Sequence, residues 1–259
     1  PVVVLFIFDQ NILSKLEDKT DKRVLFIYQE IVRLSSELQN QGSSLLVKYG
    51  NPATVWKELL NEWDIKSVYV NHDYESYGVQ RDRQVAQFLA ENGTSFQSYK
   101  DVVVFEKEEV IKDDGTPYVV FTPYSRKWKE LLNRRGFQIY NTSEHIQHFY
   151  KMSPRSLISL AEIGFNASDF TFPAKLIKSE IVTRYAEQRD FPALQGTSRL
   201  SVHLRFGTLS VRKLLQYALN KSDTFVSELI WRDFYHSILY HFPYVEKDSF
   251  RKQYDAISW

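Results

Sequence analysis

The sequence predicts an α/β fold: a Rossmann-like domain with a parallel sheet, followed by the start of an all-α domain. Short apolar runs alternate with stretches of helical periodicity in the first half, which is the pattern of right-handed βαβ units. The run VVVLFIF at 2–8 is continuously apolar, as in a strand buried on both faces. From about residue 175 onward the periodicity is helical only, so we expect a helical domain there.

Each element of the first half follows from a local pattern. Apolar residues recur at helical spacing over 22–40, which predicts an amphipathic helix. Asn51 followed by Pro52 is typical of an N-cap and the first helical position, so a helix begins there. The remaining predicted elements are strands at 2–8, 45–50, 67–71 and 95–105 (SFQSYK and VVVF) and helices at 77–91 and 124–134.

The pattern changes after residue 134. Glycine, asparagine and proline interrupt residues 136–172, which indicates a connection between domains. We therefore expect an α/β domain at 1–134, a connection at 135–172 and a helical domain at 173–259. The helical domain should contain KSEIVTRYAEQR, VRKLLQYALN and TFVSELIWRDFYHSILYHF as helices.

Composition excludes several classes of protein. With no cysteine, the chain has no disulfide, zinc ribbon, iron–sulfur ligation or thiol catalysis, and its six histidines lack metal-binding spacing, so no metal is expected. No apolar run approaches the roughly 20 residues of a membrane span. We expect a cytoplasmic monomer that does not bind membranes. A net charge of +1 argues against a general nucleic-acid coat but allows a local basic face.

One helix of the second half carries a mixed polar and aromatic face. Glu228, Trp231, Arg232 and Tyr235 stand at i, i+3, i+4 and i+7, so they share that face. Such a set can stack on a planar ring and hydrogen-bond its edge. The alternative is a solvated Glu–Arg pair beside two rim aromatics. The adjacent stripe is apolar and suits a core: Val226, Ile230, Phe234 and Ile238.

The segment 189–213 is rich in hydrogen-bond donors. The segment contains five basic residues and one acidic residue, an excess of about four positive charges. Thr197, Ser198 and Ser201 are good N-cap residues, and Arg199 lies among them, so this run suits a pyrophosphate at a helix start. Plain capping is the alternative. The charged residues are Arg189, Asp190, Arg199, Arg205, Arg212 and Lys213.

Polar residues also follow the predicted strand at 67–71. Asn71, His72 and Asp73 would lie beyond its carboxyl end, where open α/β sheets bind their ligands. Ordinary turn chemistry is the alternative for these residue types. Neither GxGxxG nor a Walker loop is present, so a nucleotide fingerprint of those kinds is excluded.

Taken together, these motifs resemble the DNA photolyase/cryptochrome family, most closely the class I cyclobutane pyrimidine dimer photolyases. The resemblance rests on YAEQRDFPALQGTSRLSVHLRFGTLSVR at 185–212, on ELIWRDFY at 228–235 and on the HFP that follows. In the first half, VVVLFIFD, VNHDYESYGVQRD and VFTPYSRKW resemble the antenna domain of that family. The likeness covers essentially the whole chain.

The resemblance implies an FAD cofactor and a substrate, UV-damaged DNA. Arg189 matches an arginine that contacts DNA, Glu228 would hydrogen-bond the pyrimidine edge and Trp231 would stack on the flipped-out dimer. Trp259 matches the outermost tryptophan of the electron-transfer chain. The residues implied to bind FAD are Tyr185, Thr197, Ser198, Arg199, Leu200, Ser201 and Arg232. Those implied to line the dimer pocket are Glu228, Leu229, Ile230, Trp231, Arg232, Asp233, Phe234 and Tyr235.

The activity implied is that of a deoxyribodipyrimidine photo-lyase. Reduced FAD, excited by blue light, would donate an electron that splits the cyclobutane ring, while the protein supplies orientation and a dry pocket. The antenna chromophore stays open between methenyltetrahydrofolate, a deazaflavin and FMN. Thr116 stands where folate-binding members tend to have an acid, and Asn71 and Asp101 are expected to line the antenna pocket.

The sequence departs from the family in three ways. It begins at the family's second strand and stops before most of the helical FAD domain, and Asp233 stands where the family more often has Glu. We therefore expect a fragment with no repair activity of its own, weak or no FAD binding and a poorly stable sheet. Two alternatives to a repair enzyme are a cryptochrome photoreceptor and a flavin-free α/β binding domain.

Overall fold

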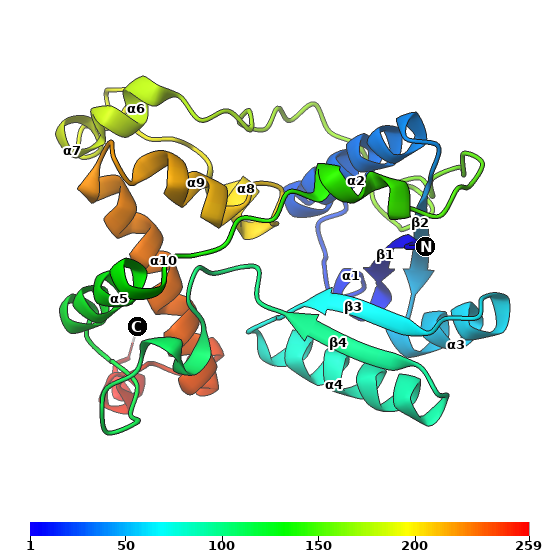
Figure 1. The fold of residues 1–259 in the computed structure, drawn as a ribbon, viewed down its shortest axis with the longest axis horizontal. Helices are drawn as coiled ribbons and strands as arrows, with labels where there is room; N and C mark the ends of the chain where they lie inside the picture. Colours follow the sequence, from blue (N-terminus) through cyan, green and yellow to red (C-terminus); the bar gives the residue numbers. More distant parts are fainter. Residues whose placement is uncertain (259) are drawn as a thin grey trace. The chain divides into compact units, whose positions relative to one another are not determined.

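The computed structural model describes residues 1–258, which form two compact units (Figure 1). Each unit is assembled from separate stretches of the chain. Unit 1 comprises residues 1–68, 83–96 and 140–173, and unit 2 comprises residues 69–82, 97–139 and those from 174 onward. The fold class is mixed α/β with parallel strands, as predicted. The domain boundaries expected at 134 and 172 stay a prediction.

The core of unit 1 is a parallel strand pair covered on both faces. Strand β1 (Val4–Asp9) pairs with β2 (Leu45–Gly50), so that Val4 lies opposite Leu45 and Asp9 opposite Gly50. Because successive side chains of a strand point to opposite faces, Leu45 joins one apolar cluster and Leu46 the other. Both clusters are buried, which explains the continuous apolar run of the sequence.

The first three helices of unit 1 begin at side-chain caps. Helix α2 (Lys22–Asn40) starts after Asp21, whose carboxylate accepts from the backbone N–H of Arg23 at 2.8 Å. Helix α3 (Pro52–Glu62) starts after Asn51, whose side-chain oxygen accepts from Ala53 N–H at 3.0 Å. The predicted Asn51–Pro52 start is confirmed. Short helix α1 (Gln10–Leu13) is capped in the same way by Asp9.

A second strand pair continues the chain. Strand β3 (Ser67–Asn71) pairs with β4 (Ser95–Tyr99), and helix α4 (Ser76–Glu91) connects the two strands along the chain. Ser95 N–H donates to Lys66 O at the start of both strands, and His72 N–H donates to Tyr99 O at the end of both. The two strands therefore run in the same direction, and the pair is parallel. Among residues 1–258, β1–β2 and β3–β4 are separate two-stranded sheets.

One predicted strand is wrong. SFQSYK and VVVF are each expected to form a short strand; β4 confirms the first and ends at Tyr99, but residues 102–105 form bends. Their apolar side chains are nevertheless buried: Val103, Val104 and Phe105 are at most 4% exposed. An apolar run of this length indicates burial but does not by itself indicate strand pairing.

Unit 2 is helical around a large aromatic and aliphatic core. Its long helices are α5 (Phe121–Arg135), α9 (Val211–Ala218) and α10 (Asp223–His241), with Trp128, Leu214 and Ile230 fully buried among them. The helix expected over 178–189 is broken at Arg184 into α6 (Ser179–Thr183) and α7 (Tyr185–Gln188). The remaining elements of unit 2 are α8 (Ser201–Arg205) and the 3₁₀ turns Lys107–Val110, Pro243–Glu246 and Lys252–Ala256, and unit 1 contains the 3₁₀ turn Thr142–His148.

Candidate functional site

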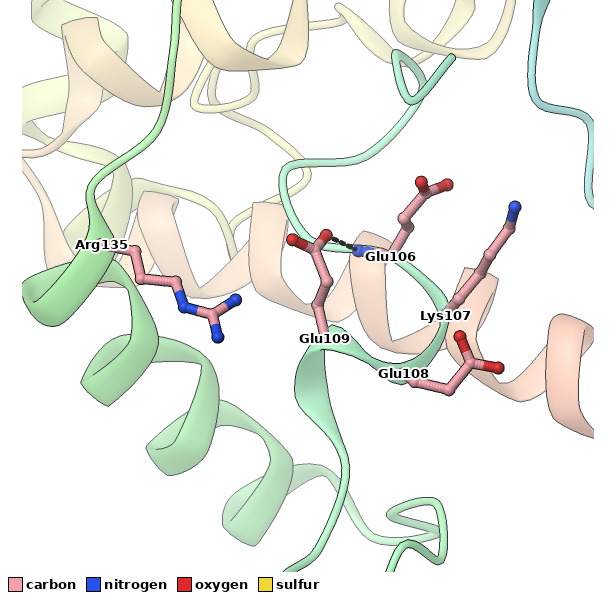
Figure 2. Close-up of a pocket in the computed structure, with 5 residues that line it drawn as sticks. All are labelled: Glu106, Lys107, Glu108, Glu109 and Arg135. Carbon is pink, nitrogen blue, oxygen red and sulfur yellow. Dashed lines mark hydrogen bonds between the residues drawn. The ribbon is translucent and has the colours of Figure 1, made fainter. Parts of the chain in front are cut away.

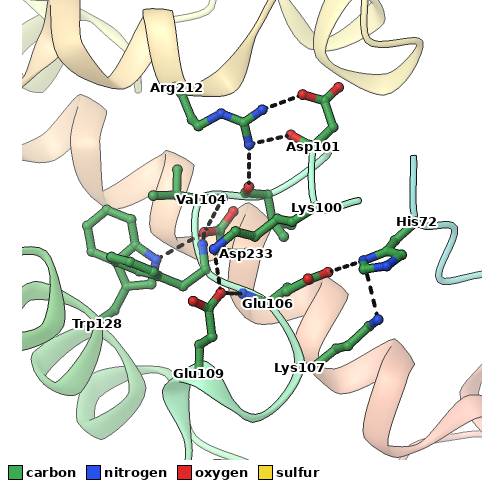
Figure 3. A network of polar contacts seen from close by, with 12 residues as sticks. His72, Lys100, Asp101, Val104, Glu106, Lys107, Glu109, Trp128, Arg212 and Asp233 are labelled. Atoms are coloured by element: carbon green, nitrogen blue, oxygen red, sulfur yellow. Dashed lines mark hydrogen bonds and ion pairs between the residues drawn. The ribbon is translucent and has the colours of Figure 1, made fainter. Parts of the chain in front are cut away.

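The segment that follows β4, residues 101–105, is held by polar side chains of α9 and α10 (Figure 3). Arg212, 6% exposed, donates to the carbonyl oxygens of Asp101 at 3.2 Å and Val103 at 3.3 Å and forms an ion pair with the Asp101 carboxylate. Asn71 Nδ2 donates to the same carboxylate at 3.2 Å. The two residues expected in an antenna pocket therefore lie together, and the charge of Asp101 is neutralised within the protein.

Asp233 accepts the N–H groups of the same segment. Its Oδ2 takes hydrogen bonds from Val104 N at 3.0 Å, Phe105 N at 3.1 Å and Trp128 Nε1 at 3.0 Å. Burial raises the pKa of Asp233 to about 6, although these three N–H donors favour the charged form. Residues 104 and 105 are thus not a strand because their N–H groups are taken by a carboxylate from a distant helix.

Arg232 is occupied by backbone carbonyls. Its guanidinium donates to the carbonyl oxygen of Val102 and, at 3.1 Å, to that of Leu204. Burial lowers the pKa of Arg232. These bonds join the segment after β4 and helix α8 to α10, and the assignment of Arg232 to FAD binding and to the dimer pocket stays a prediction.

The aromatic face predicted on α10 exists and is extended by a residue of α5. The Trp231 indole lies flat against the ring of Phe121, with centroids 3.6 Å apart and planes 5° apart. On the same helix, Tyr235 stacks on Trp231 at 5.6 Å and 25°. Tyr235 is 61% exposed, so the stack reaches the surface. Such a surface can receive a flat ring from solvent.

Glu228 lies on this face and is paired with Arg189. Their side chains form an ion pair, and both are about one-third exposed. The Arg189 guanidinium also lies over the ring of Tyr185 at 5.8 Å. Ion pairing with Glu228 raises the pKa of Arg189. The structure therefore brings together three predicted site residues, but with Arg189 and Glu228 satisfying each other.

Half of the predicted ELIWRDFY lining points inward. Leu229, Ile230, Asp233 and Phe234 are at most 5% exposed and belong to the interior of unit 2. They are buried because a helix that lies on a core buries one side of every turn, and their assignment to the dimer pocket stays a prediction. Glu228, Trp231 and Tyr235 remain at the surface of this helix.

The predicted cofactor residues Tyr185 and 197–201 lie near each other because of a close backbone approach. Gly196 packs against α7, where a Cβ atom at residue 196 would stand 2.5 Å from the carbonyl oxygen of Gln188. Only glycine fits there. This contact sets the run 197–201 beside the helix that carries Tyr185, in agreement with a shared binding role for the two.

The run 197–201 does not cap a helix as expected. Helix α8 begins at Ser201, its N-cap is Leu200 and no side chain caps it; Ser198 Oγ instead accepts from Leu200 N at 3.4 Å. Leu200 is buried, so its part is packing. Arg199 has a positive φ of 53°, a strained conformation for a residue with a side chain.

The polar side chains of this run are available to a ligand. Thr197, Arg199 and Ser201 are exposed, and none of their side chains hydrogen-bonds another residue in the part of the chain described. Two hydroxyls and one guanidinium make a donor set that fits an anionic group such as a pyrophosphate. Of the bases in the donor-rich segment 189–213, Arg199 is thus free, whereas Arg205 is paired with Glu75.

A second polar cluster lies at the end of β3. His72 Nδ1 is 2.8 Å from Glu106 Oε2, the hydroxyl of Tyr74 donates to the same oxygen at 2.6 Å, and Lys107 Nζ lies 3.3 Å from the imidazole. Burial alone would raise the pKa of Glu106, but these hydrogen bonds and the nearby positive charges have the larger combined effect. The pKa of Glu106 is therefore below its ordinary value. The partners of His72 lie 34 and 35 positions along the chain, whereas Asp73 accepts from the backbone N–H groups of Tyr74 and Glu75, so turn chemistry describes Asp73 and not His72.

A cavity of about 330 Å³ lies beside this cluster (Figure 2). Only charged residues line it, namely Glu106, Lys107, Glu108, Glu109 and Arg135. A flat chromophore needs apolar walls as well as a few polar groups, so this cavity does not suit one.

Three residues of this region, Phe121, Trp128 and Arg212, have roles that no sequence pattern indicates. Phe121 and Trp128 occur in the VFTPYSRKW run and act as ring partners and donors, and Arg212 was counted only as one base of a patch. Their partners lie about 105 to 111 residues away along the chain, so no local pattern reveals them. Trp259, the predicted electron-transfer residue, lies outside the described residues. Within residues 1–258 no group of His, Cys, Asp and Glu could hold a metal, and no helix is long and apolar enough to cross a membrane.

Comparison with known proteins identifies similar sequences over the whole chain. The sequence profile of the family described as DNA photolyase matches residues 1–143. The deoxyribodipyrimidine photo-lyase of Halobacterium salinarum is 29% identical over 100% of this chain and 58% of its own length, and that of a Synechococcus strain is 28% identical over 100% and 59%. An uncharacterized 31.6 kDa protein of another Synechococcus strain is 27% identical over 90% of this chain and 89% of its own length. The chain thus spans about half the length of the named photo-lyases.

Solved structures agree with the fold. A class III photolyase from Agrobacterium tumefaciens matches with a TM-score of 0.75 at 21% identity, covering 100% of this chain and 57% of that one. An archaeal photolyase from Sulfolobus tokodaii, solved with two FAD molecules, matches with a TM-score of 0.74 at 24% identity and covers 100% and 57%. At these identities the likeness concerns the architecture.

Proposed function

Because the chain belongs to the DNA photolyase family, we propose that it takes part in light-driven repair of cyclobutane pyrimidine dimers in UV-damaged DNA. The observation that carries the proposal is the aromatic stack that reaches the surface at Tyr235, with Glu228 on the same helix. A pyrimidine dimer offers two flat faces for stacking and polar edges for hydrogen bonds, and damage lowers the cost of flipping it out of the duplex. The Trp231–Tyr235 surface and the Glu228 carboxylate match those two features.

In this proposal the residues of α10 have different roles in recognising the dimer. Trp231 and Tyr235 hold the dimer by stacking, and Glu228 accepts a hydrogen bond from the pyrimidine edge. Arg189 must leave Glu228 for that bond to form, and it then faces a DNA phosphate. Phosphate contacts of this kind make binding weaker at higher salt. The Glu228–Arg189 pair is exposed enough to open without the cost of leaving a buried charge unpaired.

The cofactor in this proposal is FAD. When bound and reduced, it supplies the electron that opens the cyclobutane ring after excitation by light. Thr197, Arg199 and Ser201 would hold its pyrophosphate, because they are exposed donors without partners in the described chain. Tyr185 would contact the flavin from the neighbouring helix. The antenna chromophore, the monomeric state and the cytoplasmic location stay predictions.

The direct test is repair by the full-length protein that carries this sequence. We expect blue light to remove dimers from an irradiated oligonucleotide and Trp231→Ala to lower dimer binding by about tenfold or more, since base–aromatic stacking contributes about 1–3 kcal/mol. Trp56→Ala in α3 of unit 1 is the matched control and should leave binding unchanged. If the flavin absorbance changes with light but dimers are not lost, the result would contradict repair and favour a photoreceptor function.

A further inference from the structure

Phe121 is the first residue of α5 and lies against the inner face of Trp231. A centroid distance of 3.6 Å and parallel planes leave no space between the two rings for a base, whose own stacking distance is about 3.5 Å. The inner face of the indole is therefore closed.

The two ring neighbours of Trp231 differ in how firmly they are held. Both contact Phe234, Phe121 at 5.9 Å and Tyr235 at 5.8 Å, but only Phe121 is partly buried and packed against the core of unit 2. Tyr235 is 61% exposed and stacks on Trp231 with an offset, at 5.6 Å. An exposed side chain changes rotamer on a picosecond-to-nanosecond timescale. The Phe121 ring is thus held in place against Trp231, whereas the Tyr235 side chain is free to change rotamer.

We propose that Phe121 is a positioning residue for recognition of the pyrimidine dimer, fixing the plane of the Trp231 indole so that the dimer stacks only on the face opposite Phe121. The inference rests on the proposed function, because it specifies how that function's stacking surface is built. It adds a residue from α5, about 110 positions before Trp231, to a site otherwise formed by α7 and α10.

The role of Phe121 differs from ordinary core packing in what it predicts. A packing residue affects the stability of the fold and all DNA binding alike. A residue that fixes the indole plane affects the preference for dimer-containing over undamaged DNA, and it does so only while Trp231 is present. A flat ring at residue 121 should suffice, whereas an aliphatic side chain of similar size should not.

The test measures the affinity of the full-length protein for a dimer-containing oligonucleotide and for the same undamaged oligonucleotide. We expect Phe121→Leu to lower the preference for the dimer by about three- to tenfold, as aromatic pairs contribute beyond their buried area. Phe121→Tyr keeps the ring and should stay within about twofold of the parent. Phe105→Leu is the matched control, because Phe105 also packs edge-on against a tryptophan, Trp128, within unit 2.

A double-mutant cycle shows whether Phe121 acts through Trp231. In a Trp231→Leu background, Phe121→Leu should cause no further loss of preference. With 5-fluorotryptophan labelling, Phe121→Leu should also shift the ¹⁹F resonance of Trp231, assigned by its absence in Trp231→Phe. If Phe121→Leu fails to fold, Phe121→Met is used with the same expected outcomes.

The outcomes separate the inference from the proposed function. An unchanged dimer preference in Phe121→Leu, or an equal loss in the presence and absence of Trp231, overturns the role of Phe121 alone. A parent protein that binds dimer-containing and undamaged DNA equally well overturns the proposed function instead. Loss of preference in Phe121→Leu with recovery in Phe121→Tyr supports the inference.

Discussion

Unit 1 and unit 2 use charged and polar side chains in different ways. In unit 1 two hydroxyls, those of Ser43 and Ser44, bond distant backbone groups, but the ion pairs are short-range and near the surface: Arg33, for example, pairs with Glu30 and Glu37 on its own helix. In unit 2 charged side chains act in the interior and across the chain. Arg212 reaches a segment 111 residues away, and Asp233 one 129 residues away.

This difference teaches where each unit is vulnerable. A surface pair in water contributes about 0–1 kcal/mol, because solvent replaces either partner at little cost. A buried group that loses its partner cannot be resolvated, so the cost is several times larger. We therefore expect mutations at the polar contacts of unit 2 to have larger effects on stability than those of unit 1. Four predictions test this difference, from the largest effect to the smallest.

Asp233→Ala should have the largest effect. It removes the acceptor of Val104 N–H, Phe105 N–H and Trp128 Nε1–H in the interior, and we expect a loss of about 3–5 kcal/mol in the free energy of unfolding. Urea denaturation followed by circular dichroism measures it. Asp233→Asn keeps one oxygen acceptor and should lose less. A loss below about 1 kcal/mol in Asp233→Ala would show that these bonds do not hold the segment.

Two contributions to the pH dependence of the stability of unit 2 should cancel in the parent protein and become measurable in variants. Burial raises the pKa of Asp233 from 3.8 to about 6, so the folded protein binds more protons and loses stability as pH rises from about 4 to 6. Burial lowers the pKa of His236 from 6.5 to about 4, so the folded protein binds fewer protons and gains stability from about pH 4 to 6.5. The two contributions, each about 3 kcal/mol, oppose each other.

Removing either group should reveal the other. From pH 4 to 6, the stability of Asp233→Asn relative to the parent should rise by about 3 kcal/mol. That of His236→Asn relative to the parent should fall by a similar amount up to pH 6.5. Urea denaturation at several pH values measures both differences. Curves that stay parallel to the parent would mean that neither group is titrated differently in the folded state.

The caps of unit 1 should have intermediate effects. Asn51→Ala removes the acceptor of Ala53 N–H at an exposed helix start, and we expect a loss of about 1 kcal/mol. Asn51→Ser restores an acceptor and should recover most of the stability. The same denaturation experiment applies, and a loss as large as that of Asp233→Ala would remove the contrast between the units.

The surface pair of unit 1 should have the smallest effect. Glu37→Gln breaks its ion pair with Arg33, which keeps Glu30 as a partner at 2.7 Å. We expect a change of at most about 0.5 kcal/mol, and less at high salt. A larger loss that persists at 1 M salt would contradict the surface character of this pair.

The sequence predicted those parts of the fold that depend on neighbouring residues. Alternation of apolar runs with helical periodicity gave the α/β class, and the Asn51–Pro52 pair located the start of α3. The apolar stripe of α10 was also correct, since Val226, Ile230 and Phe234 are buried. These features follow from local geometry, because a helix or strand repeats its own period.

The candidate site was predicted less completely. The shared face of Glu228, Trp231 and Tyr235 follows from helical spacing alone. Spacing does not reveal that Arg189 pairs with Glu228 or that Arg232 is used by backbone carbonyls, because those partners come from other parts of the chain. The helix start expected at 197–201 was wrong in its capping, since Leu200 rather than a hydroxyl residue is the N-cap.

By itself, then, the sequence determined most of the helices and strands and the surface face of α10, each set by residues within a few positions of one another. Only the tertiary structure decided that residues 102–105 are not a strand, that Arg212 and Asp233 hold them, and that Phe121 closes one face of Trp231. The physical reason is burial. Once a backbone N–H or C=O group is removed from water it must find a partner, and here the partners come from helices more than 100 residues away.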